Sequence, residues 1–367
     1  MPLDIAIAGT RGIPANYGGF ETFAEELSHR LVQRGHRVTV YGRSHYVDPG
    51  IHEYQGVRLI TLPAIRSKYL ETVSHAALSS IDLSFRHFDV VLFCNAATAF
   101  ACLLPRLAGR GVVLNVDGIE RKRRKWNRWG RGYYRLSERL ATLLPHRIVT
   151  DARTIQSYYL ERYGQDSEFI PYGASTERCT TTSELDRLGM RPQEYLLYVS
   201  RLEPENNAHL VVEAFLKADL DLPLVLVGDA PYNRRYIEEL RTRAASGNIL
   251  MPGGIYGRGY RELLSHCLCY LHATEVGGTH PALVEAMGAG ALVIVHDNAE
   301  NREVVGECGL SCDFSDASAL AGLMREAVAR RSEWEELRQR AVAWVDANYD
   351  WERITDRYEA LFDELTG

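Results

Sequence analysis

The sequence contains no long apolar run. No stretch approaches the roughly 18 uninterrupted apolar residues that a helix needs to cross a bilayer, so we expect no membrane-spanning helix. Residues 1–4 lead straight into the short apolar segment 5–9, without the basic and apolar regions of a secretion signal. These absences predict a cytoplasmic protein.

A positive net charge and paired cysteine spacings are also missing. The formal net charge is -6, which gives no global positive field and argues against a nucleic-acid partner. Seven cysteines are present, and the spacings Cys267-x-Cys269 and Cys308-x3-Cys312 differ from those of a zinc site. We therefore expect reduced thiols, no metal and no cofactor.

The chain does contain short apolar, β-branched runs that alternate with helical patterns, which is typical of α/β domains with parallel sheets. Its 367 residues are too many for one ordinary core and suit two domains. Candidate strands are 3–8, 37–41, 57–61, 88–94, 112–116 and 147–150, followed by 195–199, 224–228, 269–272 and 292–295. Three helices are expected at the end of the chain, at 316–331, 333–348 and 351–365.

The polar segment 174–193 has the composition of a linker. We place the domain boundary inside it, which predicts two doubly wound domains, 1–175 and 176–348, and a closing helix in 349–367. Two such domains that face one another form a cleft at the carboxyl ends of their strands, where open α/β sheets bind ligands. The polar motifs that follow strands are therefore the candidates for function.

The first motif is the glycine-rich loop 9–22 between the first strand and the first helix. Gly18 and Gly19 carry no side chains where N–H groups at a helix start can approach a phosphate. The spacing is not that of the dinucleotide fingerprint, which argues against an oxidoreductase. A tight strand-to-helix turn is the alternative interpretation.

The second motif, 200–207, follows the first strand of the second domain. The guanidinium of Arg201 can bind a diphosphate with two hydrogen bonds and neutralise the charge of a leaving group. A solvated surface arginine is the alternative.

The third motif spans 272–290. Pro281 suits the first helical position, so the preceding loop can present N–H groups to an anion; the loop residues are Gly277, Gly278, Thr279 and His280. One turn further in, the two oxygens of Glu285 can accept hydrogen bonds from the vicinal hydroxyls of a ribose. A glutamate in a surface salt bridge is the alternative.

These three motifs resemble those of family-four retaining GT-B glycosyltransferases. The opening run 9–22 is similar to that of a bacterial subgroup of rhamnosyltransferases that build cell-surface polysaccharides, and the likeness covers nearly the whole chain. It implies a nucleotide-sugar-binding C-terminal domain, an acceptor-side N-terminal domain and a last helix that packs back on the N-terminal domain. It also implies a retained anomeric configuration, with the departing phosphate taking the proton of the acceptor hydroxyl.

Carried over by residue, the resemblance places Gly18 and Gly19 near the donor phosphates, Arg201 on the diphosphate and Glu285 on the ribose. Glu275 and the loop 277–280 would then face the donor sugar.

The chain departs from the family pattern at two places. The two family glutamates are normally separated by seven residues, whereas nine lie between Glu275 and Glu285, which puts the role of Glu275 in question. The family lysine that follows the arginine is replaced by Asn206 or Asn207, so that Asn206 becomes the candidate on the donor phosphates.

Acceptor-binding candidates come from the first domain. Asp117 follows a strand there and can bind an acceptor or donor hydroxyl, or instead form an Asp-Gly turn with Gly118. Tyr17 and Asp151 are further candidates of the same kind. With Arg201 and Glu275, Asp117 completes the predicted catalytic set.

A basic tract with two tryptophans can rest on an anionic membrane surface. Its predicted membrane contacts are Arg121, Lys122, Arg123, Arg124, Lys125, Trp126 and Trp129. A solvated basic helix, or one that reads an acceptor phosphate, is the alternative.

The expected function is transfer of a sugar, with rhamnose as the first choice, from a dTDP or UDP donor to a saccharide or lipid-linked acceptor. The protein is expected in the cytoplasm, with a peripheral position on the inner membrane face as a further expectation. Two alternatives stay open: a sugar-nucleotide epimerase, and a non-catalytic sugar-nucleotide-binding component of an assembly complex.

Overall fold

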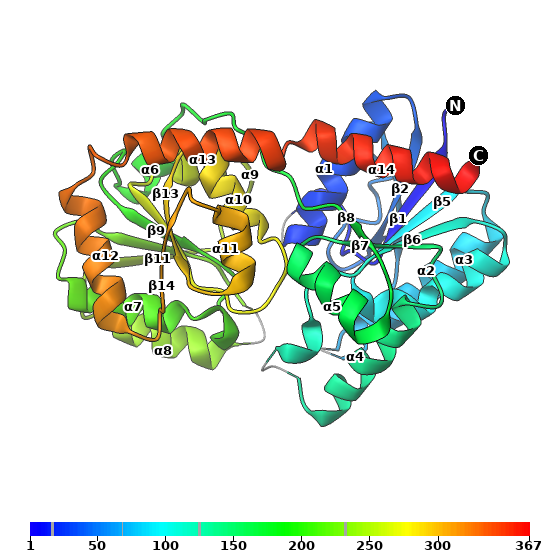
Figure 1. The fold of residues 1–367 in the computed structure, drawn as a ribbon, viewed down its shortest axis with the longest axis horizontal. Coiled ribbons are helices and arrows are strands. Elements are labelled where there is room, and N and C mark those ends of the chain that lie inside the picture. The colour runs from blue at the N-terminus through cyan, green and yellow to red at the C-terminus, as the bar shows by residue number, and fades with distance from the viewer. Residues whose placement is uncertain (16–17, 68, 124–125, 231–232) are drawn as a thin grey trace. The chain divides into compact units, whose positions relative to one another are not determined.

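The computed structural model describes residues 1–15, 18–67, 69–123, 126–230 and 233–367 (Figure 1). They form two compact units. The first comprises Met1–Tyr172, Gly277–Thr279 and Trp351–Gly367, and the second comprises Gly173–Val276 and His280–Asp350.

The first unit is built on a sheet with the strand order β3-β4-β2-β1-β5-β6-β7-β8, parallel except for the edge strand β3. Its strands are β1 (Asp4–Ala8), β2 (Arg37–Arg43), β3 (Glu53–Tyr54), β4 (Val57–Leu62), β5 (Val90–Cys94), β6 (Gly111–Asn115), β7 (Arg147–Thr150) and β8 (Glu168–Phe169). The central strands β5 and β6 are buried throughout and mainly apolar, as expected for parallel strands covered on both faces.

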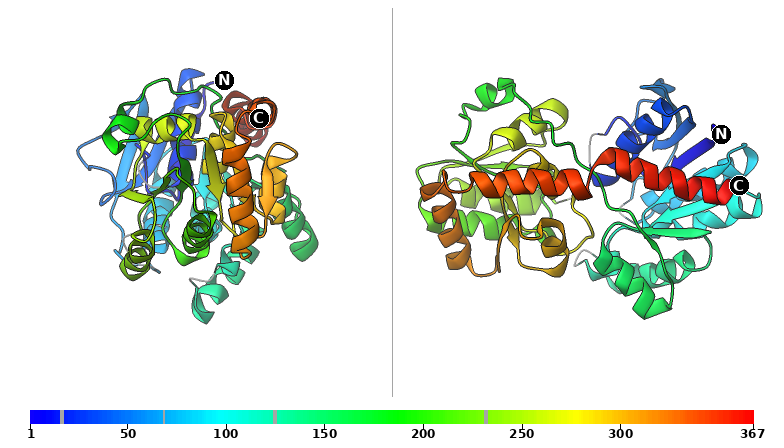
Figure 2. Two further views of the ribbon diagram at one scale, coloured as in Figure 1. Left: turned by 90° about the vertical axis from the view of Figure 1, so that its left-hand side faces the viewer. Right: turned by 45° about the horizontal axis from the view of Figure 1, so that its top comes forward.

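Helices cover both faces of this sheet. They are α1 (Gly19–Gln33), α2 (Glu71–Phe85), α3 (Leu103–Leu107), α4 (Arg128–Ala141), α5 (Arg153–Tyr163) and α14 (Trp351–Thr366), with short 3₁₀ helices η1 (Ala96–Cys102) and η2 (Glu120–Lys122). Figures 1 and 2 show α14, in red, beside the blue helix α1, and both contribute to the core on one face. Residues of α2, η1, α4 and α5 form the core on the other face.

The second unit has a wholly parallel sheet with the order β11-β10-β9-β12-β13-β14, which is the strand order of the dinucleotide-binding fold. Its strands are β9 (Leu196–Val199), β10 (Leu224–Val227), β11 (Ile249–Gly253), β12 (Cys269–His272), β13 (Leu292–His296) and β14 (Leu310–Cys312). The strand order reverses between β9 and β12, so the ligand crevice of such a sheet is expected at their carboxyl ends.

Helices cover this sheet on both faces as well. They are α6 (Ser183–Leu188), α7 (Ala208–Ala218), α8 (Arg234–Ala244), α9 (Gly257–His266), α10 (Pro281–Gly288), α11 (Ala299–Val305), α12 (Ala317–Ala329) and α13 (Glu335–Asn348), with the 3₁₀ helix η3 (Pro204–Asn206). Residues of α7, α8 and α12 form one core and those of α9, α10, α11 and α13 the other.

The predicted fold class, two parallel α/β sheets of the Rossmann type, is confirmed. All ten predicted strands coincide with observed strands. The strands that were not predicted are β3, β8, β11 and β14. Within the described residues, no helix is both long and apolar enough to span a bilayer.

Candidate functional site

Arg201 lies at the carboxyl end of β9, on one side of the point where the strand order of the second unit reverses. Its main chain is held in place, because Asn206 Nδ2 donates a hydrogen bond of 2.7 Å to the Arg201 carbonyl oxygen. The guanidinium is half-buried and pairs with no carboxylate in the described part of the chain. A cation in this position is suited to an anionic ligand.

Gly228, at the end of the neighbouring strand β10, allows the two strand ends to come close together. It has a φ of +150°, and a Cβ at this position would lie 1.8 Å from the Ser200 carbonyl oxygen. Only glycine fits there without movement of the backbone that carries Arg201.

Glu275 lies on the other side of the reversal point, after β12. Asn207 joins the two sides, because its Nδ2 donates to Glu275 Oε1 at 2.9 Å and to the Ala273 carbonyl oxygen at 3.0 Å. Asn207 has a φ of +58°, a left-handed conformation that asparagine tolerates better than most residues. The structure therefore brings Arg201 and Glu275 to adjacent strand ends of one sheet.

Asn206 is less available than the sequence suggested. Its side chain is buried and is bound to the Arg201 carbonyl oxygen, so it supports the loop that bears the arginine. Its other amide hydrogen is the only one left for a ligand, because an amide group has two.

Glu285 lies one turn into α10 and is oriented by a residue that the sequence did not reveal. Tyr260, on α9, donates its hydroxyl to Glu285 Oε2 at 2.5 Å. Burial, together with the Glu285 carboxylate, raises the pKa of Tyr260 well above its ordinary value, so the phenol stays protonated as a donor. This hydrogen bond fixes the orientation of the Glu285 carboxylate.

His272 and His280 stand near the beginning of α10, with ring centroids 4.7 Å apart. Burial lowers the pKa of His272 to about 3, so this ring is neutral at physiological pH. His280 is the N-cap residue and Pro281 the first residue of α10. The start of α10 carries the partial positive charge of the helix dipole, which is suited to an anion.

The loop residues Gly277–Thr279 belong to the first unit. The N–H of Thr279 donates to Asp151 Oδ2 at 2.8 Å. A Cβ on Gly278 would lie 2.2 Å from Asp151 Oδ1. The prediction that this whole loop offers unused N–H groups is therefore wrong for Thr279, because a buried carboxyl takes its N–H.

Asp117 and Asp151 come together at the carboxyl edge of the first sheet. Asp151 is fully buried, and Asp117 is the neighbouring acidic residue. Burial, reinforced by the neighbouring Asp117, raises the pKa of Asp151 well above its ordinary value. Burial and a neighbouring carboxyl group both disfavour the ionised form of Asp151.

Tyr172 adds a polar group to this pair. Its hydroxyl is buried and has no hydrogen-bond partner among the described residues. Burial, with Asp117 and Asp151 as the nearest charges, raises the pKa of Tyr172 well above its usual value. Asn115 supports the same edge, because Tyr358 OH accepts a bond of 3.0 Å from its Nδ2.

Acidic side chains of α1 accept hydrogen bonds from main-chain N–H groups of the glycine-rich loop. Glu21, in the first turn of α1, accepts a hydrogen bond of 2.9 Å from the N–H of Arg11, and Glu25 accepts one of 2.5 Å from the N–H of Ala15. Gly18 is the N-cap of α1, which begins at Gly19. Tyr17 lies outside the described residues.

Part of the predicted membrane tract points into the first unit. Arg121 forms an ion pair of 3.1 Å with the buried Glu138, and Arg123 forms one of 2.6 Å with Glu120. Trp126 packs on Tyr134 with ring centroids 5.1 Å apart. Trp129 is exposed, whereas Arg124, Lys125 and the side chain of Lys122 lie outside what the structure describes.

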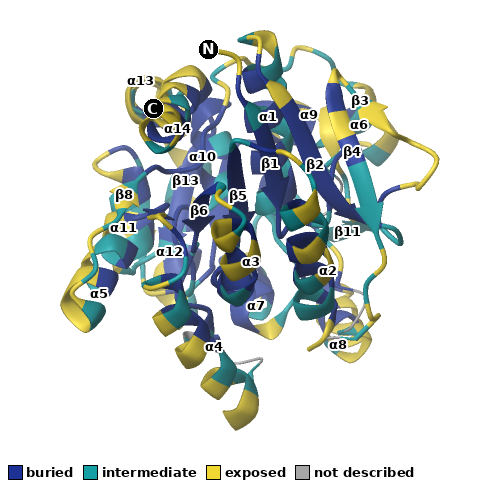
Figure 3. Ribbon diagram, turned by 90° about the vertical axis from the view of Figure 1, so that its right-hand side faces the viewer, coloured by how far each residue is buried: buried dark blue, intermediate teal, exposed yellow. Residues whose placement is uncertain are grey.

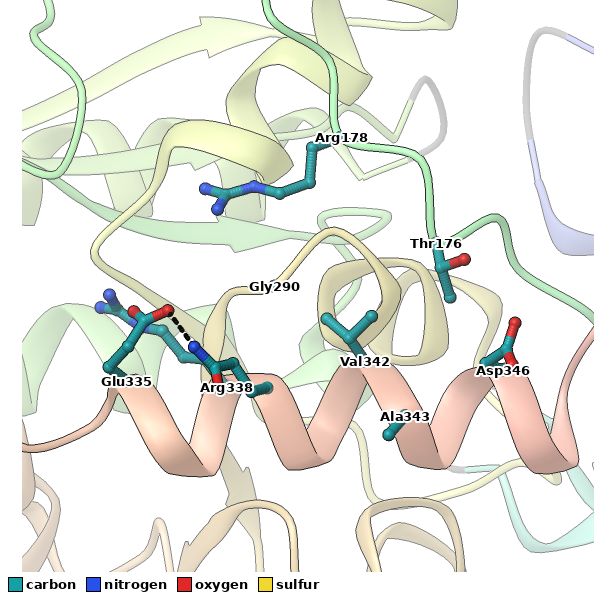
Figure 4. A pocket seen from close by; sticks show the side chains of 9 residues that line it. Thr176, Arg178, Gly290, Glu335, Arg338, Val342, Ala343 and Asp346 are labelled. Carbon is teal, nitrogen blue, oxygen red and sulfur yellow. Dashed lines mark hydrogen bonds between the residues drawn. The ribbon is translucent and has the colours of Figure 1, made fainter.

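A cavity of about 460 Å³ lies elsewhere in the second unit (Figure 4). Thr176, Arg178, Gly290 and residues of α13 line it. Gly290 precedes β13, so the cavity is at the amino edge of the sheet. It is therefore separate from the strand ends that carry Arg201 and Glu275.

Two family models match the chain. Residues 187–344 match the model described as glycosyl transferases group 1. Residues 3–175 match a domain of unknown function, DUF1972.

A curated relative and solved structures are also similar. The chain is 23% identical to O-antigen chain mannosyltransferase B of Escherichia coli over 214 residues, which are 57% of this chain and 52% of that protein. The chain thus spans about half the length of this relative.

Sucrose-phosphate synthase from Thermosynechococcus elongatus superposes with a TM-score of 0.80 at 18% identity, over 98% of each chain. Anabaena HepE, solved with UDP-glucose, superposes with a TM-score of 0.80 at 16% identity, over 99% of this chain and 100% of that chain.

The class of the protein follows from these findings. Residues 187–344 match the group 1 glycosyl transferases, and both sheets have the Rossmann-like architecture of the GT-B fold. The chain therefore has the GT-B fold, and its match to group 1 glycosyltransferases lies in the C-terminal half.

Proposed function

We propose that this chain is a retaining glycosyltransferase that moves a sugar from a nucleoside diphosphate to a hydroxyl of a saccharide or lipid-linked saccharide, in the synthesis of a bacterial cell-surface polysaccharide. The group 1 match over 187–344 supports the reaction class. The name of the relative, an O-antigen chain mannosyltransferase, supports a polysaccharide product.

One observation carries the donor site. Arg201 and Glu275 follow the two strands that flank the reversal point of the second sheet. Asn207, in the loop that follows Arg201, donates to Glu275 at 2.9 Å and to the Ala273 carbonyl oxygen at 3.0 Å. The guanidinium binds the diphosphate there, and Glu285, oriented by Tyr260, accepts the ribose hydroxyls. Asn206, the start of α10 and the glycines at 18–19 and 277–278 complete the proposed donor contacts.

The reaction then depends on charge and position. The acceptor hydroxyl oxygen bonds to the anomeric carbon while the bond from that carbon to the phosphate oxygen breaks. The leaving diphosphate gains negative charge, which Arg201 stabilises, and a phosphate oxygen takes the hydroxyl proton. On the first unit, Asp117 and Asp151 bind the acceptor, because carboxyl oxygens accept hydrogen bonds from hydroxyl groups.

For the donor we propose a dTDP- or UDP-sugar, with rhamnose as the sugar to test first. The opening run 9–22 supports rhamnose through its resemblance to rhamnosyltransferases. Mannose and glucose are the necessary comparisons, since they are the sugars named for the relative and for HepE.

A thermal-shift series with dTDP, UDP, GDP and ADP tests the donor site, because a ligand that binds only the folded state raises the melting temperature. We expect the largest shift with dTDP or UDP and its loss in Arg201→Ala. Equal, negligible shifts with every nucleotide would refute the proposed site.

Turnover separates the proposal from its alternatives. Sugar transfer from dTDP-rhamnose to a saccharide acceptor supports it. Conversion of the donor without an acceptor would identify an epimerase. Nucleotide binding without turnover, across donors that include UDP-glucose and GDP-mannose, would identify a non-catalytic binding component.

A further inference from the structure

The outer sides of α2 and α3 present large apolar side chains to solvent. Leu78, Ile81 and Phe85 recur on one side of α2, and Phe85 is 87% exposed. Leu104 and Leu107 continue the surface on α3, where Leu107 is 74% exposed. Figure 3 shows exposed residues, in yellow, on α2, α3 and α4. Side chains of this size usually pack against other apolar groups, because removal of their surface from water is favourable.

Helix α4 lies on the same face of the first sheet and has two exposed stripes. Trp129, which is 74% exposed, and Leu136 are one heptad apart and form an apolar stripe that Leu143 extends beyond the helix end. A basic stripe runs beside it and consists of Arg128, Arg131, Arg135 and Arg139. The opposite side of the helix carries its buried residues, such as Tyr134 and Ala141.

The exposed charge of α4 has one sign. The only acidic residue of the helix, Glu138, is buried and paired with Arg121. Arg131, Arg135 and Arg139 form no ion pair in the part of the chain that the structure describes. The surface is therefore locally cationic on a chain whose net charge is -6.

We propose that the outer surface of α2, α3 and α4, which we call the α2–α4 face, docks on an anionic lipid bilayer. The leucines, Phe85 and Trp129 enter the interfacial region, and the arginines of α4 bind lipid phosphates. Exposed apolar side chains beside arginines are the two features by which an interfacial helix binds such a surface. This inference goes beyond the proposed reaction, because docking needs neither donor nor acceptor.

Two other occupants fit the face less well. A second copy of the chain would bring a second set of α4 arginines into the same interface, and like charges brought close together repel. A nucleic acid would pair with the arginines, but exposed Leu107 and Phe85 would gain nothing from its phosphate backbone. A lipid surface satisfies both the charge and the apolar side chains.

The α2–α4 face is not the tract predicted from the sequence. Arg121, Arg123 and Trp126 make contacts inside the first unit, whereas Arg128, Arg131, Arg135 and Arg139 are exposed among the described residues. Only Trp129 is common to both.

Vesicle flotation with the full chain tests the proposal. The vesicles contain phosphatidylcholine alone or equal parts phosphatidylcholine and phosphatidylglycerol. The test variant is Arg131→Gln/Arg135→Gln/Arg139→Gln. The control, Arg241→Gln/Arg243→Gln/Arg331→Gln, removes three exposed arginines from the second unit.

We expect binding to the anionic vesicles and little binding to the neutral ones. The test variant should lower the partition coefficient by about 100-fold, since each cation near an anionic surface contributes roughly a factor of five. The control should stay within about a factor of two of the unmodified chain. Phe85→Ser/Leu107→Ser should also weaken binding, and circular dichroism should show each variant folded.

Equal flotation of the test and control variants would overturn the proposal, as would no flotation of the unmodified chain. A dimer in light scattering that Phe85→Ser/Leu107→Ser dissolves, without vesicle binding, would assign the face to a second copy. Retention of single-stranded RNA without vesicle binding would assign it to nucleic acid. The vesicles carry no sugar nucleotide, so these results do not depend on the proposed reaction.

Discussion

At the scale of single residues, Arg201 is the side chain on which the proposed chemistry depends most. Arg201→Ala removes the cation that faces the leaving diphosphate, so we expect kcat/KM to fall about 100- to 1000-fold. The main-chain bond to Asn206 involves the Arg201 carbonyl and is retained in the variant, so the fold should not change. Steady-state kinetics together with the nucleotide thermal shift measures both effects.

The matched control is Arg241→Ala, on the exposed surface of α8. It removes the same charge from the same unit, and its turnover should equal that of the unmodified chain. Near-normal activity of Arg201→Ala would show that Arg201 does not belong to the donor site.

Gly228 and Gly322 provide a paired test of local packing. A methyl group at Gly228 would meet the Ser200 carbonyl oxygen at 1.8 Å and would also force a residue with a side chain to a φ of +150°. We expect Gly228→Ala to destabilise the protein by about 3 kcal/mol or more, because backbone must move. A methyl group at Gly322, inside α12, would meet nothing within 4 Å, so Gly322→Ala should stabilise by roughly 0.5–1 kcal/mol.

Urea denaturation of the two alanine variants gives both values. Similar stability of Gly228→Ala and Gly322→Ala would show that the β9 and β10 ends tolerate separation.

The candidate donor residues could be predicted from the sequence, whereas their supporting partners could not. Arg201 and Glu285 stand out because each follows a strand or opens a helix, and the type of residue indicates the ligand. Tyr260 is 25 positions from Glu285, and Asn207 is 68 positions from Glu275. Pairs at such distances are created by the packing of separate elements, which no local pattern encodes.

At the scale of elements, His75 makes α2 sensitive to pH. Its ring is buried, and the Gly42 carbonyl oxygen of β2 lies 3.0 Å from Nε2. Burial, with Arg43 beside it, lowers the pKa of His75 to about 4, while Glu71 opposes this shift. The neutral ring is therefore the form that the folded helix accepts.

The sign of the effect follows from this shift. The ordinary pKa of the ring is 6.5, so the unfolded chain binds a proton that the folded unit does not, between 6.5 and about 4. The stability that neutral His75 contributes is complete above pH 6.5 and falls as the pH drops toward 4. At about pH 5 the loss should be about 2 kcal/mol relative to about pH 7.

Comparison with His75→Gln isolates this residue, because other groups titrate equally in both proteins. The unfolding free energy of the unmodified chain should fall more steeply than that of the variant over this range. Parallel pH profiles would mean that the ring is accessible to protons in the folded state.

Most elements could be predicted because their residues carry the pattern of their environment. The fully apolar runs of β5 and β10 indicate strands covered on both faces. The edge strands β3 and β8 have two residues each, which is too short for any periodicity. The contacts of the basic tract could not be predicted either. The sequence shows the charge of Arg121 but not that its partner is Glu138 on α4.

At the scale of the whole molecule, chain order and spatial grouping differ at the C-terminus. Helix α14 follows all of the second unit in the sequence, yet it is part of the first. Its residues Trp351, Ile354, Tyr358, Leu361 and Phe362 are buried in the core that includes α1. Exposed ion pairs such as Arg34–Asp356, at 2.6 Å, add little to this packing, because pairs at the surface contribute about 0–1 kcal/mol.

Removal of α14 should therefore destabilise the first unit and leave the second unit, which directly precedes α14 in the sequence, folded. Burial of a large apolar side chain contributes about 1.5–3 kcal/mol, so the five side chains together are worth roughly 10 kcal/mol, comparable with the stability of a whole domain. We expect truncation after Asp350 to abolish the cooperative unfolding of the first unit while the second unit keeps its nucleotide-dependent thermal shift. Hydrogen exchange measured by peptide distinguishes the two units.

Truncation after Leu365 is the matched control, because it removes only Thr366 and Gly367 and leaves the buried residues of α14 in place. Its exchange pattern should match that of the full chain. If the longer truncation instead left β1, β5 and β6 protected from exchange, the apolar face of α14 would not be required for the first core. If it abolished the nucleotide shift as well, the second unit would depend on the first for its stability, and the donor site would have to be studied only in the intact chain.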